Sequence, residues 1–213
     1  MIAIIDYQIS NIFSVKHAFD SLGKKSIVTS DPKVVLKAKA AILPGVGAFG
    51  DCMTNLRNFH LVDAIEKFIK SGRPFMGVCL GLQLLFSQSA EFGQHRGIGV
   101  IEGEVKKFPA RNQKNKLIRV PQISWNQVYH KKNTLANWQT SPLNTLKNNE
   151  YMYFIHSYYV QPKDKGIICS YTNYSGFEYC SSIIKDNIFA VQFHPEKSGP
   201  RGIEIYRNWV NAQ

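Results

Sequence analysis

The most informative stretch of the chain is Phe75-Met76-Gly77-Val78-Cys79-Leu80-Gly81-Leu82-Gln83. An apolar, β-rich run leads into Gly-x-Cys-x-Gly, and a helix-compatible run follows it. Glycines two positions before and after Cys79 remove side chains that would clash in a sharp strand-to-helix turn. The pattern predicts a nucleophile elbow, in which the amino terminus of the helix favours the thiolate form of the cysteine. The alternative interpretation is a buried cysteine packed between two glycines.

Strand and helix patterns alternate around this stretch in the first half of the chain. Short apolar runs predict buried strands over residues 2–5, 26–28, 40–43 and 74–78. The first strand is followed by a predicted helix that Ser10 or Asn11 caps and Gly23 ends. Asp31-Pro32 predicts the start of a second helix, because proline fits the first helical position. A third predicted helix has Leu61, Ile65, Phe68 and Ile69 on its apolar face. Another helix follows from Leu80.

The second half of the chain is richer in strand patterns. The predicted β-rich runs cover residues 100–108, 124–130, 151–160, 167–171, 177–184 and 188–193. Residues 185–187 predict a hairpin turn between the last two runs. A final helix carries Ile203, Tyr206, Trp209 and Val210 on one face. Helices alternating with parallel strands, followed by hairpins, predict an α/β fold with a mixed sheet. No linker divides the chain, so we expect one domain over residues 1–213.

Composition excludes several classes of protein. Of the 213 residues, 44% are hydrophobic and 12% aromatic, which favours a packed globular protein over a disordered one. No run approaches the roughly 20 apolar residues of a membrane helix, so no membrane association is expected. The amino terminus has no basic leader, and we expect a cytoplasmic protein. The four cysteines show no metal-binding spacing, and no metal site is predicted. They are Cys52, Cys79, Cys169 and Cys180.

The chain is strongly basic, with 26 basic and 15 acidic residues and a net charge of +11. Its densest basic set has few interleaved aromatic residues and no nucleic-acid-binding motif beside it. This set comprises Lys106, Lys107, Arg111, Lys114, Lys116 and Arg119. We therefore expect no nucleic-acid partner and interpret the set as a solvated face. A surface for an acidic partner or a phosphorylated substrate is the alternative.

A histidine and a carboxylate that could assist a cysteine nucleophile occur late in the chain. A predicted strand ends at His194, and Glu196 stands two residues later with a proline between them. This spacing can bring the carboxylate to the imidazole and fix its tautomer. The other histidines considered lack such a neighbour and are interpreted as surface or core residues. They are His17, His60, His95 and His130.

A third glycine-containing turn follows the strand at residues 40–43. It is Leu43-Pro44-Gly45-Val46-Gly47, and its glycines allow backbone N–H groups to turn inward as an oxyanion hole requires. An ordinary glycine turn is the alternative. This turn, Cys79 and His194 all follow strands. In a parallel sheet they gather at one edge, the carboxyl ends of the strands.

Together these motifs resemble the class I glutamine amidotransferases, which pair a Gly-x-Cys-x-Gly elbow with a late His-x-Glu. Within that family the chain is similar to the glutaminase subunits of imidazole glycerol phosphate synthases. The matching stretches span nearly the whole chain. They are residues 5–7, 43–47 with Phe49, 77–86, 125–126, 156–158 and 192–198. The resemblance implies a flavodoxin- or Rossmann-like three-layer sandwich with a mixed central sheet, and it implies no cofactor.

The resemblance also implies roles for individual residues. Cys79 is the implied nucleophile, His194 the general base and acid, and Glu196 the residue that orients His194. The implied oxyanion hole comprises Gly45, Val46, Gly47 and the N–H of Leu80. The implied glutamine-binding residues are Gln83, Glu91 and Ser157. Each of these three has an ordinary alternative, as a helix-edge polar residue, a solvated acid and a strand hydroxyl.

The family works with a partner. The resemblance implies a heterodimer with a (β/α)₈-barrel cyclase, which receives ammonia from glutamine and acts in histidine biosynthesis. The residues implied at that interface are Asn11, Trp125, Asn126, Tyr153 and Lys197.

Two segments depart from the family pattern. Where the family has Asp-Tyr-Gly-x-Gly-Asn, this chain places Gln8 and Ser10 at the glycine positions. Where the family has Pro-His-x-Gly-Trp-Asn, it has Gln122 and Ser124. Both segments belong, by the resemblance, to the partner face, and each lost glycine removes φ > 0 freedom. One alternative is a paralogue that supplies ammonia for amidation of a surface-polysaccharide sugar. Another is a non-catalytic binding subunit of the same fold.

Overall fold

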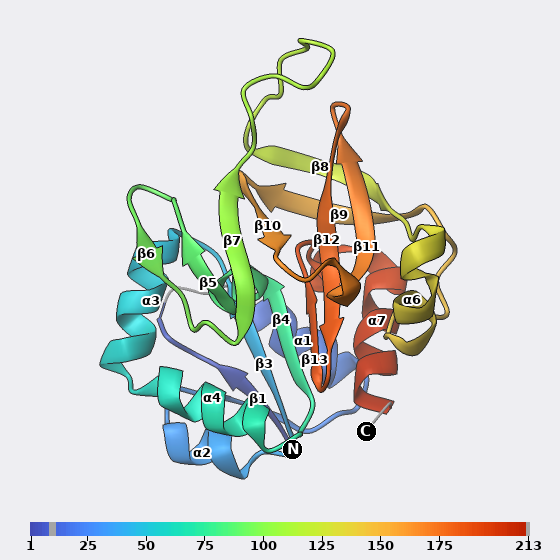
Figure 1. Ribbon diagram of the computed structural model, residues 1–213. Helices are drawn as coiled ribbons and strands as arrows, with labels where there is room; N and C mark the ends of the chain where they lie inside the picture. Colours follow the sequence, from blue (N-terminus) through green and yellow to red (C-terminus); the bar gives the residue numbers. More distant parts are fainter. Residues whose placement is uncertain (9–11, 212–213) are drawn as a thin grey trace.

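The computed structural model describes residues 1–8 and 12–211. Its centre is a mixed sheet of eleven strands with helices on both faces (Figure 1). This arrangement confirms the predicted α/β fold with a mixed central sheet. No helix within the described ranges is long and apolar enough to cross a membrane. The predicted helix caps Ser10 and Asn11 lie outside the described residues.

Five parallel strands form one half of the sheet, in the order β2-β1-β3-β4-β13. They are β1 (Ile2–Ile5), β2 (Ser26–Thr29), β3 (Ala40–Gly45), β4 (Phe75–Cys79) and β13 (Ile188–Val191). Because they are parallel, the segments that follow β3, β4 and β13 meet at one edge of the sheet. These segments carry the three motifs that the sequence singles out.

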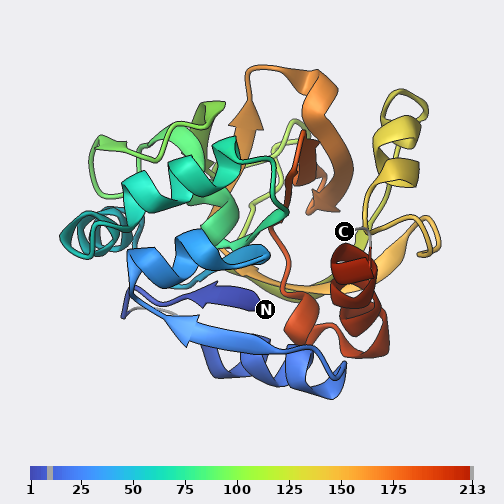
Figure 2. The same cartoon turned by 90° about the horizontal axis from the view of Figure 1, so that it is seen from below.

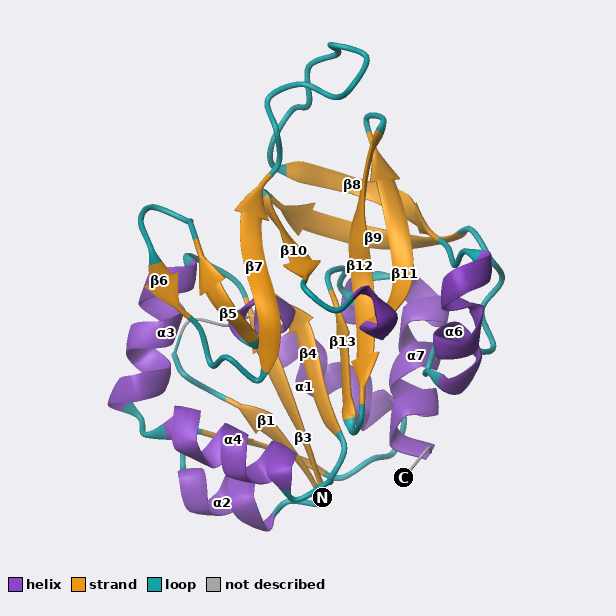
Figure 3. Ribbon diagram, viewed as in Figure 1, coloured by secondary structure: helices purple, strands orange, loops and turns teal. Residues whose placement is uncertain are grey.

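The other half of the sheet is largely antiparallel and continues from β13 as β12-β10-β7-β5-β6, with β11 paired to β12. Its strands are β12 (Phe177–Lys185), β10 (Tyr158–Pro162), β7 (Ile101–Lys107), β5 (Phe86–Ser89), β6 (His95–Arg96) and β11 (Ile168–Tyr174). A separate ribbon of two strands, β8 (Gln122–Val128) and β9 (Glu150–His156), crosses above the main sheet (Figure 3).

Helices cover both faces of the main sheet (Figure 2). One face has α1 (Ile12–Ser21) and α7 (Gly199–Asn211). The other has α2 (Pro32–Lys37), α3 (Phe49–Asn58), α4 (Leu61–Lys70) and the short α5 (Leu80–Leu84). A further helix, α6 (Leu135–Thr140), lies beside β11. A hydrophobic core lies on each face of the sheet, and alternate residues of β1 pack into one or the other. Ile2 and Ile4 pack on the α1 side, and Ala3 and Ile5 pack on the opposite side.

Local sequence explains most of these elements. At α2, for example, Pro32 occupies the first turn and the Asp31 side chain accepts a hydrogen bond from the Lys33 N–H at 2.8 Å. Helices α3 and α6 were not predicted. The β-rich run predicted over residues 151–160 forms two strands, because the chain breaks at Ser157 into β9 and β10. The two pieces pair with different strands, β8 and β7, and only tertiary pairing decides that.

Helix α5 packs unusually closely on β3. A Cβ atom added to Gly81 would lie 1.8 Å from the Leu43 carbonyl oxygen. Glycine is therefore required where the helix starts beside the strand, and the close contact holds the turn between β4 and α5 in place.

We expect Gly81→Ala to lower the free energy of unfolding by about 3 kcal/mol, because α5 must move away from β3. Chemical denaturation measures the effect. Gly99→Ala is the matched control, since Gly99 has φ +78° but no atom within 4 Å of its added Cβ. It should cost only about 1 kcal/mol of backbone strain. Equal losses in the two variants would show that the close packing at Gly81 has no special role.

Candidate active site

The turn at Cys79 has the sharp geometry that the glycine pattern predicts. Cys79 ends β4, α5 begins at Leu80, and Cys79 itself has φ 56° and ψ −112°. A positive φ in a non-glycine residue typically costs about 1–3 kcal/mol and persists only where the surroundings enforce it. Here the close packing of α5 against β4 and β3 enforces it, and Gly77 and Gly81 permit that packing, because a Cβ at Gly77 would already be 3.0 Å from the Gly81 carbonyl carbon. The strained turn presents the Cys79 side chain at the carboxyl edge of the sheet.

His194 and Glu196 form a buried hydrogen-bonded pair near this cysteine. The His194 Nδ1–H donates to Glu196 Oε1 at 2.7 Å, and both side chains are only 3% exposed. The Tyr206 hydroxyl, from α7, donates to the other oxygen of Glu196 at 3.1 Å. His194 Nε2 is buried and makes no hydrogen bond to any described residue. The arrangement fixes the imidazole with Nε2 free for proton transfer.

The electrostatics of His194 favour the protonated ring. Burial lowers its pKa, but interactions with Cys79 and with Glu196 outweigh burial and raise the pKa to about 10. Burial raises the pKa of each of the other three cysteines: Cys52 to about 12, Cys169 to about 11, and Cys180 also upward. These three thiols are poor nucleophiles at neutral pH.

A pocket of about 200 Å³ opens beside Cys79. Its lining includes the predicted glutamine-binding set and most of the predicted oxyanion set, although these residues are far apart in sequence. The lining residues are Val46, Gly47, Cys79, Leu80, Gln83, Glu91, Ile155, His156, Ser157 and Tyr158. The structure therefore brings Cys79, the glutamine-binding set and most of the oxyanion set together around one small cavity, whereas Gly45, His194 and Glu196 do not line it.

Within this pocket the three predicted glutamine-binding residues have different environments. Gln83 is buried, and its Nε2 donates to the Tyr158 carbonyl and to Gln192 Oε1, both at 3.0 Å. Glu91 Oε2 accepts a hydrogen bond from the Phe49 N–H at 2.7 Å, while burial raises the pKa of Glu91. Ser157 is half-buried at the break between β9 and β10. The polar groups of Gln83 and Glu91 thus have fixed positions before any ligand binds.

The predicted oxyanion residues approach the pocket from two elements. Gly45 ends β3, where a Cβ would lie 2.5 Å from the Tyr7 hydroxyl oxygen, so only glycine fits. Gly47 has φ +109°, a conformation that favours glycine. Val46 and Gly47 line one side of the pocket, and Leu80, at the start of α5, lines another. Backbone N–H groups from both elements are therefore close to Cys79.

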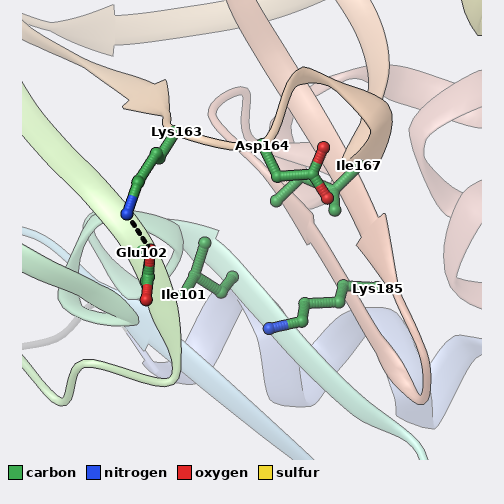
Figure 4. A pocket seen from close by; sticks show the side chains of 6 residues that line it. All are labelled: Ile101, Glu102, Lys163, Asp164, Ile167 and Lys185. Carbon is green, nitrogen blue, oxygen red and sulfur yellow. Dashed lines mark hydrogen bonds and ion pairs between the residues drawn. The ribbon is translucent and has the colours of Figure 1, made fainter.

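A second and larger pocket, of about 400 Å³, contains none of the predicted site residues (Figure 4). Its lining residues are Ile101, Glu102, Lys163, Asp164, Ile167 and Lys185. Lys163 Nζ is paired with Glu102 Oε2 at 2.8 Å, and both side chains are largely exposed. No group of three metal-ligating side chains occurs among the residues that the structure describes.

The predicted partner-face residues mostly gather on the outer side of the β8–β9 ribbon. Trp125 is 52% exposed, and its ring lies 6.1 Å from that of Tyr153 on the neighbouring strand. Lys197 Nζ lies 5.9 Å from the centre of the Tyr153 ring. Asn126 instead turns inward, where its Nδ2 donates to the Asn173 carbonyl at 2.9 Å. Asn11 lies outside the described residues.

The two departures from the family pattern have unequal consequences. Gln8 is exposed and takes φ +66°, so the residue that replaces glycine keeps a backbone conformation that glycine favours. Gln122 is fully buried, and therefore lies beneath the outer face of the ribbon that Ile123 and Trp125 form. The Gln122 side chain therefore forms no part of the exposed surface of its segment, and the expectation that both changed segments lie on the partner face stays a prediction.

Known proteins resemble this chain along nearly its whole length. The family model for class I glutamine amidotransferases matches residues 3–212. A relative from Geobacter metallireducens, "Imidazole glycerol phosphate synthase subunit HisH", is 43% identical over 98% of this chain and 97% of its own length. A protein of the same name from Aquifex aeolicus is 42% identical over 97% of this chain and 94% of its own length.

Solved structures share the fold at much lower sequence identity. One, "Crystal structure of glutamine amidotransferase", has a TM-score of 0.71 at 16% identity and covers 99% of this chain and 97% of its own. "Structure of PurLQS from Thermotoga maritima" has a TM-score of 0.69 at 18% identity, with the same two coverages.

The fold and the family match define a glutamine amidotransferase. The chain belongs to the class I glutamine amidotransferase family, in the branch of imidazole glycerol phosphate synthase HisH subunits. The names of the relatives favour the histidine-pathway prediction over the sugar-amidation alternative. The presence of Cys79, His194 and Glu196 gives no support to a non-catalytic subunit.

Sequence reasoning missed two polar residues that contact this site. Gln192 is buried, and its Nε2 donates to Cys79 Sγ at 3.7 Å. Tyr206 was predicted only as a core residue of the last helix, yet its hydroxyl binds Glu196. A glutamine in an otherwise apolar strand was the available indication for Gln192. Nothing in the helix pattern distinguished Tyr206.

The raised pKa of His194 makes stability depend on pH. A group whose folded pKa is above its unfolded value contributes stability that is complete below the unfolded pKa and is lost as pH rises through the folded one. We expect this contribution to decline between about pH 6.5 and pH 10. In Glu196→Gln the decline should be smaller, because the carboxylate that stabilises the imidazolium is gone. Denaturation at a series of pH values measures it, and parallel curves for the two proteins would contradict the assignment.

Proposed function

We propose that this chain is the glutaminase subunit of an imidazole glycerol phosphate synthase, a single domain over residues 1–213. It hydrolyses glutamine at Cys79 and passes ammonia to a (β/α)₈-barrel cyclase in histidine biosynthesis, in the cytoplasm. The observation that carries the proposal is the buried His194–Glu196 pair beside a strained Cys79, at a pocket with fixed polar groups. The relatives named HisH support the pathway.

The first half-reaction forms a thioester. The Cys79 thiolate attacks the carbon of the glutamine side-chain amide, and the carbonyl oxygen becomes an oxyanion. Protonated His194 then gives the Nε2 proton to the nitrogen, and ammonia leaves as the carbon–oxygen double bond reforms. Glu196 holds the ring in the tautomer and orientation that this transfer requires, and Tyr206 in turn holds Glu196.

The second half-reaction hydrolyses the thioester. His194, now neutral, takes a proton from water, and the resulting hydroxide adds to the thioester carbon. Collapse of this second oxyanion expels the Cys79 thiolate and releases glutamate. Both oxyanions need hydrogen-bond donors, for which we propose the backbone N–H groups of Val46, Gly47 and Leu80, with Gly45 allowing the close packing.

The remaining pocket residues suit the amino-acid end of glutamine. The Glu91 carboxylate suits an α-ammonium group, and the hydroxyl of Ser157 suits an α-carboxylate. Gln83 adds a buried amide whose position is held by two hydrogen bonds. The raised pKa of Glu91 fits this role, because an ammonium ligand would restore the favourable charge interaction that burial removes.

The partner face that we propose is the outer side of the β8–β9 ribbon. In the register of the ribbon, Ile123 lies opposite Ile155 and Trp125 lies opposite Tyr153. Ile123, Trp125, Tyr151 and Ile155 are exposed large apolar residues. Exposed apolar side chains gathered in this way are typical of protein interfaces. Ile155 also lines the glutamine pocket, so the same strand serves the interface and the site.

The proposal predicts glutaminase activity that depends on Cys79. The purified chain, mixed with a histidine-pathway cyclase subunit and its phosphoribosyl ligand, should release glutamate from glutamine faster than the chain alone. Cys79→Ala should abolish the release, because no other thiol is activated. Cys169→Ala is the matched control and should retain it, since Cys169 is buried, with its pKa raised to about 11. Release of glutamate by Cys79→Ala, or none from the folded wild-type pair, would contradict the proposal.

The basic charge lies next to the proposed partner face. Residues 105–149 contain no Asp or Glu but include Lys106, Lys107, Arg111, Lys114, Lys116, Arg119, Lys131, Lys132 and Lys147. The hairpin between β7 and β8 projects above the ribbon and contains part of this set (Figure 1). Such a surface suits an acidic partner and speeds association by long-range attraction.

Arg119→Glu should therefore slow association with the cyclase subunit several-fold at low salt, with the difference fading as salt screens the charges. Surface plasmon resonance at two or more ionic strengths measures it. Lys70→Glu is the control and should have little effect, because it changes the charge equally at an exposed side chain of α4, at the other end of the sheet. Equal effects of both variants would mean that only net charge matters.

A further inference from the structure

A continuous buried chain of polar groups links the β8–β9 ribbon to the nucleophile. It begins at Gln122 on β8, reaches His156 through the Tyr179 hydroxyl, and continues to the Tyr158 carbonyl. The Tyr158 carbonyl also accepts from Gln83, Gln83 bonds Gln192, and Gln192 donates to Cys79 Sγ. Every side chain in this hydrogen-bonded series is buried.

Three elements meet at the far end of this chain. Gln122 and His156 are opposite each other in the register of β8 and β9, and Tyr179 reaches them from β12 in the main sheet. Tyr179 Oη lies 2.9 Å from the Gln122 side-chain oxygen and 3.2 Å from His156 Nε2. One hydroxyl therefore connects the ribbon to the main sheet.

The surroundings make these polar contacts important. The ring of Phe108 lies 5.2 Å from that of Tyr179 and 5.3 Å from that of His156, and Phe154 packs against both. In so apolar an environment a polar group without a partner is costly, whereas a satisfied network is rigid. Burial also lowers the pKa of His156 to about 4, so the ring is neutral at pH 7.

Counting protons gives the chain a direction. The His156 Nδ1 atom lies 2.8 Å from the Tyr158 carbonyl oxygen, which only accepts, so Nδ1 carries the single proton of the neutral ring. His156 Nε2 is then an acceptor and needs the Tyr179 proton. In the present orientation that proton goes to Gln122 Oε1, and Gln122 Nε2 is left buried without a partner. Turning the Gln122 amide over lets its NH₂ donate to Tyr179 Oη and leaves the Tyr179 proton for His156 Nε2.

The residues fixed by this chain form the wall of the pocket. His156 and Tyr158 line it, with Ile155 and Ser157 between and beside them. The Ile155 carbonyl oxygen lies 3.9 Å from Cys79 Sγ. Movement of the end of β9 would therefore change the distance between the nucleophile and the groups that hold glutamine.

We propose that Gln122, Tyr179 and His156 are positioning residues for the glutamine pocket. They form a directed hydrogen-bond chain in which the Gln122 NH₂ donates to Tyr179, Tyr179 to His156 Nε2, and His156 Nδ1 to the Tyr158 carbonyl. The effect on catalysis rests on the proposed glutaminase function, whereas the direction of the chain does not. Gln122, which departs from the family pattern, is thus part of the support of the site.

The direction of the chain is tested on the wild-type protein without any substrate. ¹⁵N NMR at pH 7, with His156 assigned by its loss in His156→Gln, should show a neutral ring protonated at Nδ1 and unprotonated at Nε2. A proton on Nε2, or a doubly protonated ring, would overturn the proposal. This measurement holds even if variants at Tyr179 fail to fold.

The positioning role is tested with Tyr179→Phe. We expect kcat/KM for glutamine to fall about tenfold, mainly through KM, because one buried hydrogen bond and its alignment are lost. The rate at which the small reagent iodoacetamide alkylates Cys79 should stay within about twofold, since the nucleophile and His194 remain. Tyr159→Phe is the matched control, because Tyr159 packs in the same aromatic cluster 6.2 Å from the Tyr179 ring.

The outcomes separate the two proposals. Equal kcat/KM values for Tyr179→Phe and Tyr159→Phe would overturn the positioning role. A parallel loss of iodoacetamide reactivity in Tyr179→Phe would also overturn it, because the damage would then reach beyond the pocket wall. If the wild-type protein with its partner hydrolyses no glutamine, the proposed glutaminase function is wrong. The NMR result still decides the direction of the hydrogen bonds from Gln122 to the Tyr158 carbonyl.

Discussion

The strained turn at Cys79 is the constraint on which the site depends. Its positive φ is maintained because α5 starts against β3, where Gly81 meets the Leu43 carbonyl without a Cβ between them. That contact places the amino terminus of α5, the loop after β3 and the thiol within one small space. A site assembled in this way is pre-organised, and the strain that it stores is offset by the packing of the sheet around it.

The parallel sheet then brings the other catalytic groups to the same edge. His194 follows β13, which is paired directly with β4, so a residue 115 positions further along the chain reaches the cysteine. Glu196 is held in turn by Tyr206 of α7, and α7 packs with α1 on the opposite face from α5. Both helical layers therefore support the site.

The departures from the family pattern are accommodated in two different ways. Gln8 keeps the positive φ at a cost in strain, whereas Gln122 is absorbed into a buried polar network that extends to Cys79. In the sequence, Gln122 looks like a substitution on the partner surface. In the structure, its side chain is part of the buried hydrogen bonds that hold the wall of the pocket. Its outer neighbours Ile123 and Trp125 keep the exposed apolar face.

Sequence patterns are enough to predict the α/β alternation, the elbow around Cys79 and the pairing of His194 with Glu196. These depend on glycine spacing, apolar periodicity and a two-residue separation, all of which are local. The break at Ser157 and the inward position of Gln122 arise from long-range packing. So do the contacts of Gln192 and Tyr206, because each depends on which distant strand or helix lies opposite. Local pattern cannot encode that choice, since many pairings bury the same apolar faces equally well.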